Sequence, residues 1–510
     1  MEKPGQLVIC ADCGIQVGSG HVMRCLALAQ AWKGAGGAVT FLVREGLSGI
    51  EERIRAEGIL LERLPEESGP SPEAFVHAVL RFGSAIAVLD GYGFGAREQA
   101  ALSRSGIRVL TVDDYGHASA YPARWVLNQN AYAAPEMYTR TNRDTRLLLG
   151  PCYAMLREEF LPWMGWRRSI PERAQKILIT IGGSDAENAS KQILGSLELL
   201  ECKDKDLEVV LVVGGGNPHW EVLQTSLERC PVAVRMVRSV QDMPALMAWA
   251  DVAIAGAGVT SYELCYMGLP SLLLIVAENQ RRVAERLSEL GVAVNAGTTR
   301  EFRREAFARQ LKALIESAER RRAMSLGARE LVDGLGSERV RAALVDRELK
   351  LRLARASDCG LLFEWAGDAV ARAASFHSAP IAWEEHTRWF AERLQDPHAV
   401  IYIGENAGGE PVGLVRFQIK DDSAVLSVNV APAFRGEGWG RELILFATRA
   451  LLRTLARAGS VRRIDAFVKP ENQASVRLFE ASGFRRAGGE RVAGQDALLF
   501  TWERGNGTYV

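Results

Sequence analysis

The stretch LVICADCGIQVGSGHVMRCLALA, residues 7–29, combines a strand pattern, a glycine turn and a helical pattern. Residues 7–12 are apolar and end in an aspartate, which is typical of a short buried strand. Apolar residues then repeat at helical spacing at Val22, Cys25, Leu26 and Ala29. A helix is therefore predicted from about residue 21 to residue 34. A strand, a turn and a helix in this order favour an α/β fold.

The alternation of strand and helix patterns continues outward from this stretch and then begins a second time. The first series has strand patterns at residues 38–43, 85–92 and 107–114. After a loop rich in Trp and Arg (163–173), the second series has strand patterns at residues 176–183, 207–216, 232–237 and 251–258. Two consecutive open α/β units predict two Rossmann-like lobes. Ligands are expected in a cleft at the C-terminal edges of their strands.

The last part of the chain follows a different pattern. Residues 300–349 are dense in Arg, Glu, Ala and Leu and are predicted to be helical. From about Leu351 the apolar segments indicate a small α+β domain with antiparallel strands. The predicted domains are therefore 1–160, 161–345 and 346–510.

Length and composition exclude several classes of protein. The 510 residues predict two to four domains. Lys plus Arg equals Asp plus Glu, at 62 each, so charge does not favour a nucleic acid or membrane partner. No apolar run is long enough to span a bilayer, and the N-terminus lacks a signal-peptide pattern. A cytoplasmic location is expected, and the oligomeric state stays open.

The glycine turn before the first helix places a histidine at a helix N-terminus. Gly18 and Gly20 let the backbone approach an anion, and the helix N-terminus favours negative charge. The same end of a helix disfavours imidazolium, so a neutral His21 is expected. Such a ring beside a phosphate-bearing ligand can take a proton from water. From spacing alone, a plain structural turn with a hydrogen-bonded histidine is slightly favoured.

The second series of strands offers parts of a nucleotide site. A glycine turn at Gly182 and Gly183 leads into a predicted helix start at Ser184 and Asp185. A second glycine turn precedes Glu263, whose carboxylate can accept both ribose hydroxyls. A solvated helix residue is the alternative for Glu263. The side chain of Asn279, after the next strand, is in a position to read a base edge.

The motifs of the first 340 residues together resemble one enzyme family. ADCGIQVGSGHVMRCLALA, LDGY, VDD, NQNAY, YAMLREEF, IGGSD and the series GAGVTSYEL, GLP and ENQ are similar to the nucleotide-sugar hydrolase family of pseudaminic acid biosynthesis. The resemblance covers residues 5–340. It implies the two-lobed glycosyltransferase-B fold, and hydrolysis of UDP-2,4-diacetamido-2,4,6-trideoxy-β-L-altrose by water attack at the anomeric carbon with inversion.

The resemblance also implies roles for individual residues. His21 is the general base that activates water, and no metal is expected. A place on the sugar side is implied for Asp12, Asp90 and Tyr92, with Asn128, Asn130 and Tyr132 as weaker candidates. A UDP-binding role is implied for Gly182, Gly183, Ser184, Asp185 and Glu263. Gly18 and Gly20 of the anion-binding turn, and Asn279, are also predicted to bind substrate. The family is expected to have an arginine where this chain has Cys10, which puts one polar contact in doubt. Cys10 and Cys13 form a lone CxxC, read as strand-end residues rather than ligands.

A second resemblance is carried by residues 427–452. The turn RGEGWG, residues 435–440, follows a strand and opens a helix, so its backbone N–H groups suit a pyrophosphate. This turn and the segment KPENQASVRLFEASGFRR, residues 469–486, resemble the acetyl-CoA-binding parts of the GNAT acetyltransferases. The implied cofactor-binding residues are Val428, Val430, Arg435, Gly436, Gly438, Trp439, Gly440, Asn472 and Phe479.

Phe479 marks a departure from the GNAT pattern, in which a tyrosine commonly protonates the departing thiolate. Water or another group must then protonate CoA. The segment 376–390 resembles the acceptor side of the UDP-4-amino-sugar N-acetyltransferases. Glu385 and His386 are the predicted bases, with Glu384 and His377 as further candidates. An exposed helix start is the alternative explanation of the acidic pair.

The two resemblances point to neighbouring steps of one route. The GNAT domain is expected to acetylate the 4-amino group of a UDP-amino sugar with acetyl-CoA, and the lobes to hydrolyse the product. Two alternatives stay open: a glycosyltransferase of the same fold, and a nucleotide-sugar sensor without activity. The sequence leaves undetermined the exact acceptor, its C4 configuration and whether both sites are active.

Overall fold

The first lobe is a parallel sheet of seven strands with order β3-β2-β1-β4-β5-β6-β7. The computed structural model describes residues 5–14, 18–44, 48–64, 72–200, 207–228, 230–238, 240, 242–454 and 461–503. The strands are β1 (Gln6–Ala11), β2 (Ala38–Val43), β3 (Leu60–Arg63), β4 (Ile86–Asp90), β5 (Arg108–Val112), β6 (Trp125–Asn128) and β7 (Arg146–Leu149). The helices are α1 (Gly20–Gly34), α2 (Ser48–Ala56), α3 (Pro72–Leu80) and α4 (Ala96–Arg104), with short turns η1 (Pro135–Met137), η2 (Pro151–Tyr153) and η3 (Glu158–Trp163).

Both faces of this sheet are buried, which explains the unbroken apolar pattern of its strands. Leu7 and Ile9 of β1 join one core cluster, together with the inner face of α1. Val8 and Cys10 point the other way, into a second cluster. The alternation follows from the two-residue repeat of a strand.

The second lobe repeats the arrangement with six parallel strands in the order β10-β9-β8-β11-β12-β13. The strands are β8 (Lys176–Thr180), β9 (Glu208–Val213), β10 (Ala233–Arg238), β11 (Val252–Gly256), β12 (Ser271–Ile275) and β13 (Val294–Thr298). The helices are α5 (Ala189–Leu197), α6 (Trp220–Leu227), α7 (Met243–Trp249), α8 (Thr260–Tyr266), η5 (Glu278–Gln280), α9 (Arg281–Glu289), α10 (Arg304–Glu316) and α11 (Ala318–Leu331). Both lobes therefore confirm the predicted Rossmann-like alternation.

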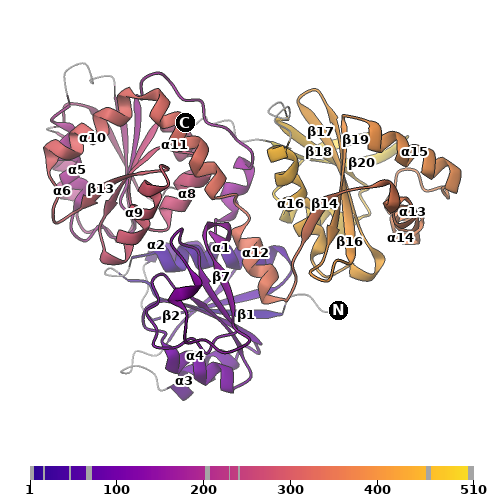
Figure 1. The fold of residues 1–510 in the computed structure, drawn as a ribbon, viewed down its shortest axis with the longest axis horizontal. Coiled ribbons are helices and arrows are strands. Elements are labelled where there is room, and N and C mark those ends of the chain that lie inside the picture. The colour runs from indigo at the N-terminus through magenta and orange to yellow at the C-terminus, as the bar shows by residue number, and fades with distance from the viewer. Residues whose placement is uncertain are drawn as a thin grey trace.

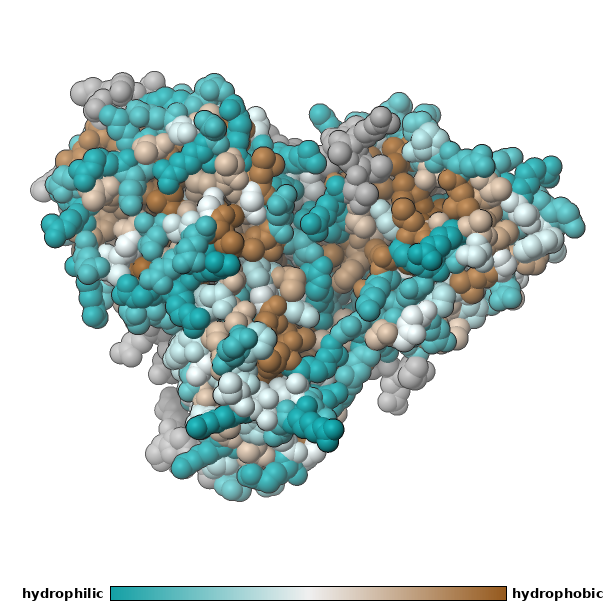
Figure 2. All heavy atoms as spheres, in the orientation of Figure 1, coloured by the Kyte–Doolittle hydropathy of each residue, from teal (hydrophilic) through white to brown (hydrophobic). Residues whose placement is uncertain are grey.

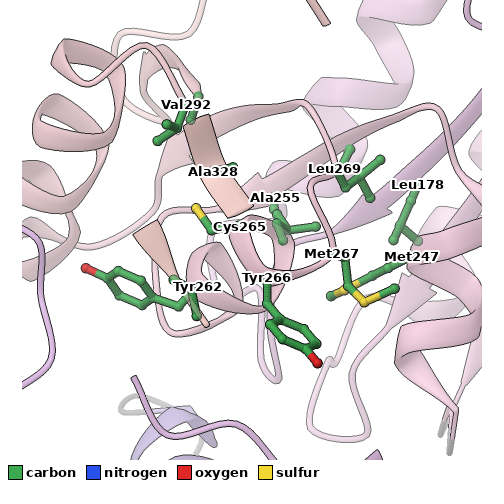
Figure 3. Packing of buried hydrophobic residues seen from close by; sticks show 14 of the residues in the cluster. Leu178, Met247, Ala255, Tyr262, Cys265, Tyr266, Met267, Leu269, Val292 and Ala328 are labelled. Carbon is green, nitrogen blue, oxygen red and sulfur yellow. The ribbon is translucent and has the colours of Figure 1, made fainter. Parts of the chain in front are cut away.

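Helix α8 lies in the core of the second lobe and reaches toward the first. Figure 3 shows Tyr262, Cys265 and Tyr266 of this helix in the cluster with Leu178, Met247 and Ala255. The two tyrosine rings extend away from the cluster in different directions (Figure 3). Tyr266 donates to the carbonyl of Phe160, while Tyr262 donates across to the first lobe. The apolar packing of α8 thus fixes the positions of the Tyr262 and Tyr266 hydroxyl groups.

Helix α12 (Gly336–Leu344) lies outside the domain predicted for it. The range 161–345 assigned it to the second lobe, but Val340, Ala343 and Leu344 pack in the core cluster of the first lobe. Its first residue, Gly336, abuts the backbone of Ala154, where a Cβ would lie 2.1 Å from the carbonyl oxygen. The chain therefore returns to the first lobe before it enters the third domain (Figure 1).

The third domain is a seven-stranded mixed sheet with order β14-β15-β16-β17-β18-β20-β19. The strands are β14 (Lys350–Leu353), β15 (Ala399–Glu405), β16 (Pro411–Lys420), β17 (Ser423–Val430), β18 (Arg463–Val468), β19 (Arg485–Val492) and β20 (Gln495–Glu503). The helices are η6 (Ala356–Asp358), α13 (Cys359–Gly367), α14 (Ala369–Ala374), α15 (Trp383–Gln395), η7 (Pro432–Phe434), α16 (Trp439–Thr454) and α17 (Gln473–Ala481). Figure 1 shows α16 on one side of this sheet and α13 to α15 on the other.

Buried charges join the third domain to the lobes. Arg441 and Glu442, in the first turn of α16, are 3% and 0% exposed. Arg441 pairs with Glu338 of α12, and Glu442 pairs with Arg341 of the same helix. Arg441 also donates to Glu158 of η3 at 3.0 Å. The domains are thus held by a buried charged network, which we call the junction cluster: Glu338, Arg341, Arg441 and Glu442.

The surface is mixed in character. Figure 2 shows hydrophilic residues along the outer margins of this face and hydrophobic residues gathered in its middle and over the third domain. In the described ranges, no helix is both long and apolar enough to cross a membrane.

Candidate functional site

His21 is the second residue of α1 and faces the second lobe at the edge where β1 ends. Its side chain is buried, with 6% of the residue exposed. Ser19 occupies the N-cap position but makes no side-chain capping bond. The first-turn N–H groups of α1 are therefore not capped by this side chain, which leaves them suited to an anion.

The ring of His21 is held by Asp90, the last residue of β4. His21 Nδ1 lies 2.6 Å from Asp90 Oδ1. Arg24 Nη2 also lies 3.0 Å from Nδ1. Because the contact to Asp90 is the shorter one and a carboxylate only accepts hydrogen bonds, we assign a proton to Nδ1. In the neutral ring the lone pair then lies on Nε2, which is the arrangement that a general base needs.

Asp90 differs in role from the sugar contact expected for it. The residue is 0% exposed, and both carboxylate oxygens accept hydrogen bonds from Arg24, at 2.7 Å each. Burial opposes its ionisation, but the charges of Arg24 and His21 outweigh burial and hold the pKa of Asp90 well below its usual range. Asp90 is thus a positioning residue for His21, because its oxygens are already occupied.

Arg24 was not predicted from the sequence. It lies one helical turn after His21 and joins Asp90 to Asp114, whose Oδ1 it reaches at 2.7 Å. Burial lowers the pKa of Arg24, yet the two carboxylates raise it well above its usual value. The sequence does carry one indication of this role: Arg24 follows His21 by three residues, on a helix face that is otherwise apolar.

The Asp90→Asn substitution tests the positioning role. An asparagine amide can donate to Nδ1 and so favour the tautomer with its proton on Nε2. We expect the hydrolysis rate at saturating substrate to fall by about 10²–10³-fold with little change in KM. The rate of UDP release measures this. The matched control Asp144→Asn, at an exposed position, should leave the rate unchanged. An Asp90→Asn rate within threefold of wild type would exclude the role.

Tyr92 joins the two lobes rather than standing free for substrate. Its ring meets that of His21 edge-on, with centroids 5.1 Å apart. Its hydroxyl accepts a hydrogen bond from Asn279 Nδ2 of the second lobe at 2.5 Å, and donates to Asp114 at 3.3 Å. Asn279, predicted to read a base edge, donates to Tyr92 through its amide nitrogen in this structure, and its role toward a base stays a prediction.

A second hydrogen bond between the lobes also joins a tyrosine to an asparagine, but here the tyrosine belongs to the second lobe and the asparagine to the first. Tyr262 of the second lobe donates to Asn130 Oδ1 at 3.0 Å, and its oxygen accepts from the N–H of Ala131 at 3.1 Å. Asn130 also donates to Asp114 Oδ1, and Tyr132 donates to the Asp114 carbonyl at 2.6 Å. The predicted NQNAY residues do come together, with Asp114 at their centre.

A second aspartate-histidine pair lies on another side of Tyr92. His117 Nδ1 is 2.7 Å from Asp113 Oδ2, and the His117 ring meets Tyr92 edge-on at 5.7 Å. Burial lowers the pKa of His117, but its pairing with the Asp113 carboxylate raises it more. The VDD motif, residues 112–114, entered the resemblance, but His117, three residues after it, was not predicted. The pair of Asp113 and His117 was therefore missed.

Asp12 keeps one oxygen available. Its Oδ2 accepts from the N–H of Gly93 at 3.3 Å, while Oδ1 is buried with no hydrogen-bond partner among the described residues. A buried acceptor without a partner is costly unless a ligand satisfies it. The geometry is compatible with the predicted sugar contact of Asp12.

The glycine turns of the two lobes meet at the start of α1. A Cβ placed on Gly183 would lie 2.6 Å from Ser19 Oγ, and one on Gly20 would lie 3.7 Å from Val259 Cγ2. Gly18 adopts φ +78°, a conformation that L side chains rarely take. Residues 15–17 of this turn lie outside the described residues. Three turns, before α1, α5 and α8, thus converge on one place.

Asp185 serves a different purpose from the UDP contact predicted for it. Its Oδ1 accepts from the N–H of Ala189 at 2.7 Å, and its Oδ2 from Ser190 at 3.1 Å. The carboxylate therefore caps α5 and occupies the place where an anion would bind. The neighbouring Ser184 is partly exposed.

Glu263 is buried, so the alternative of a solvated helix residue is wrong. It is 5% exposed and pairs with Arg157 at 2.9 Å. Burial raises the pKa of Glu263, and the charge of Arg157 opposes this rise. Arg157 belongs to the YAMLREEF motif, which the sequence flagged without assigning it a role.

The third domain has an opening between two central strands. β17 and β18 run parallel but pair only from Ser423 to Val425, opposite Arg463 to Asp465. Beyond these residues the strands no longer pair, and the turn at residues 435–440 follows β17. Gly436 and Gly438 have φ of +78° and +90°. An opened pair of strands beside a glycine turn at a helix start fits a ligand that carries a pyrophosphate.

Side chains of this turn are already engaged in the protein. Arg435 donates to the carbonyl of Val430 at 3.1 Å and pairs with Asp368 of the α13–α14 connection at 2.6 Å. Trp439 is 3% exposed and donates to Glu437. The backbone of the turn, rather than these side chains, is thus the group available to an anion.

Three predicted residues of the third domain prove to be structural. His386 is 3% exposed, stacks 6.2 Å from Phe390, and contacts the Cys359 carbonyl through Nε2 at 3.2 Å. Burial lowers its pKa. Phe479 packs in the core against Phe500, and Asn472 caps α17 by accepting from Ser475. Glu385 is exposed.

Metal-binding clusters were also sought. Across the described ranges, no group of three or more His, Cys, Asp or Glu residues is arranged to hold a metal ion.

Comparison with known families assigns both parts of the chain. Residues 348–485 match the acetyltransferase (GNAT) domain, and residues 176–335 match the glycosyltransferase family 28 C-terminal domain. The chain joins a glycosyltransferase-B-type part to a GNAT domain. This confirms the predicted fold class.

Three curated relatives extend the comparison. A spore coat polysaccharide biosynthesis protein of Bacillus subtilis is 30% identical over 39% of this chain and 56% of its own length. An uncharacterized protein of Methanocaldococcus jannaschii is 21% identical over 94% and 97%. The pseudaminic acid cytidylyltransferase and UDP-2,4-diacetamido-2,4,6-trideoxy-β-L-altropyranose hydrolase of Helicobacter pylori is 25% identical over 57% and 48%. The chain thus spans about half the length of the first and third relatives.

Proposed function

We propose that the glycosyltransferase-B-type lobes hydrolyse UDP-2,4-diacetamido-2,4,6-trideoxy-β-L-altrose to UDP and the free sugar, as a step of pseudaminic acid biosynthesis. The observation that carries this proposal is the His21–Asp90 pair at the start of α1. The similarity of the chain to the Helicobacter hydrolase supports the same substrate.

In the proposed reaction His21 Nε2 takes a proton from water. The water oxygen attacks the anomeric carbon, the bond from that carbon to the diphosphate oxygen breaks, and UDP leaves. The configuration at the anomeric carbon of the released sugar is inverted. Asp90 stabilises the imidazolium that forms, because their contact is short and buried. Water rather than a sugar hydroxyl is the nucleophile in this account.

The UDP group is proposed to lie where the glycine turns meet. The first turn of α1 carries no side-chain cap, whereas α5 is capped by Asp185. We therefore place the diphosphate beside Ser19, Gly20 and Gly183 rather than at α5. The N-terminal end of a helix stabilises the negative charge that develops on the leaving diphosphate. Glu263 is proposed to accept the ribose hydroxyls.

The GNAT domain is proposed to acetylate the precursor sugar. The 4-amino group of UDP-4-amino-4,6-dideoxy-N-acetyl-β-L-altrosamine attacks the thioester carbonyl of acetyl-CoA, the C–S bond breaks, and the thiolate takes a proton. His386 is buried in the core and is not proposed to move a proton, and Phe479 has no ionisable group. We propose Glu385 as the base that takes the proton from the 4-amino group. Fusion raises the local concentration of the acetylated product at the hydrolase.

A single incubation tests both activities. The full chain is mixed with acetyl-CoA and the UDP-amino sugar, and products are followed by mass spectrometry. We expect acetylated UDP-sugar first, then free 2,4-diacetamido-2,4,6-trideoxy-L-altrose and UDP. Acetylation without UDP release would contradict the hydrolase assignment. UDP release from the amino sugar without acetylation would contradict the proposed order.

A glycosyltransferase is the second candidate function, favoured by the match of residues 176–335 to a glycosyltransferase family. It predicts that UDP release depends on an added sugar or lipid acceptor. Release at an undiminished rate without any acceptor would exclude it.

A further inference from the structure

Arg416, in the middle of β16, stands out among the described residues because its charge has no ion-pair partner there. The side chain lies with its guanidinium carbon 5.3 Å from the ring centroid of Trp389. In the described part of the chain no carboxylate lies within ion-pair distance of it. Burial lowers its pKa, and the charge of Arg393 lowers it further. An arginine held in this way is normally paired with an anion.

The face of the sheet that carries Arg416 is the one under α13 and α15. Arg416 lies opposite Ile401 on β15, and Ile401 packs with Phe390 of α15. Strand alternation places Leu414 on the same face, and Leu414 packs against that cluster. The part of this face formed by Ile401, Leu414 and Phe390 is apolar, so a charged residue beside it needs a reason.

Polar groups continue from Arg416 toward the opening between β17 and β18. Arg416 pairs across the sheet with Ser427 of β17, so their Cβ atoms are about 5 Å apart. Ser427 and Asn429 share this face, and both lie beyond Val425, where β17 stops pairing with β18. All three side chains are partly exposed. A partly exposed polar strip therefore runs from Arg416 toward the opening between β17 and β18.

We infer that Arg416 binds the diphosphate of the acetyltransferase's acceptor, which makes that acceptor a nucleotide-linked amino sugar and not a free amine. The inference rests on the proposed acetyl transfer. Acetyl-CoA is proposed to place its pyrophosphate at the turn before α16, which follows the end of β17 at Val430, whereas Arg416 pairs with Ser427, three residues before that end. An unpaired guanidinium on the side of α13 and α15 is thus available to the second substrate.

The test is steady-state acetylation by the full chain, followed by release of the CoA thiol. The amine is either the UDP-amino sugar or the same amino sugar without UDP. Arg416→Met keeps an apolar stem beside Trp389 and removes the charge. We expect KM for the UDP-amino sugar to rise about 10–100-fold, the loss typical of one charge-assisted contact. KM values for acetyl-CoA and for the free amino sugar should stay within twofold.

The control Arg388→Met removes an exposed charge next to Trp389 on α15 and should change neither KM. An unchanged KM for the UDP-amino sugar in Arg416→Met would overturn the inference. A raised KM for acetyl-CoA would also overturn it, because Arg416 would then bind CoA. Hydrolysis of the acetylated UDP-sugar by the same variant reports that the chain is folded.

Wild-type measurements keep the inference testable if Arg416→Met does not fold. UDP should inhibit acetylation competitively with the UDP-amino sugar and leave the KM for acetyl-CoA unchanged. Absence of such inhibition would overturn the inference. If wild type acetylates neither amine, the proposed function fails. If it acetylates both with equal KM, only the Arg416 assignment fails.

Discussion

Replacing His21 with asparagine should lower the rate of UDP release by about 10³-fold or more while acetyl transfer stays at its wild-type rate. The amide cannot take a proton from water, and a general base of this kind contributes about 10²–10⁴-fold. Loss of the Asp90 contact adds to the effect, because the buried carboxylate loses one of its partners. Single-turnover hydrolysis of the acetylated UDP-sugar measures the rate.

The matched control is His77→Asn, at an exposed position on α3. It should hydrolyse at the wild-type rate. A His21→Asn rate within tenfold of wild type would mean that another group activates water. Unchanged acetyl transfer in the same protein shows that the substitution acts on the lobes alone.

Replacing Arg441 with methionine should destabilise the junction between the lobes and the GNAT domain by about 3–5 kcal/mol, the usual cost of breaking a buried ion pair. The substitution leaves Glu338 and Glu158 without this guanidinium, and the Ala481 carbonyl without its donor. Urea unfolding, followed through the transition that separates the domains, measures the loss.

Arg453→Met is the matched control, because Arg453 is an exposed residue of the same helix α16. We expect its effect to stay within about 0.5 kcal/mol. If Arg441→Met costs no more than this control, the junction cluster does not hold the domains together. Arg441 follows the acetyl-CoA turn directly, so a loosened junction should also raise the KM for acetyl-CoA.

The local part of the site could be predicted because it depends on neighbours in the sequence. Around His21, a continuous apolar run predicts the strand, and an apolar repeat at helical spacing predicts the helix after the glycine turn. The prediction of β1 and α1 is correct to within one residue at each end. Predicted residues at the ends of β4 and β6 also meet, because parallel strands end at one edge of a sheet.

Other predicted site residues have a partner within the protein that the sequence did not indicate. Asp185 turns back to cap α5, which its left-handed backbone conformation allows. Asn279 meets Tyr92 only because the lobes face each other, which no local pattern encodes. His386 carried a readable signal, since Trp383, Trp389 and Phe390 at i−3, i+3 and i+4 mark a packed helix face.

The most direct test of the central claim is hydrolysis of the acetylated UDP-sugar in ¹⁸O-labelled water, with mass spectrometry of both products. Activation of water by His21 for attack at the anomeric carbon predicts ¹⁸O in the released sugar and none in UDP. Label in UDP would show attack at phosphorus and contradict the account.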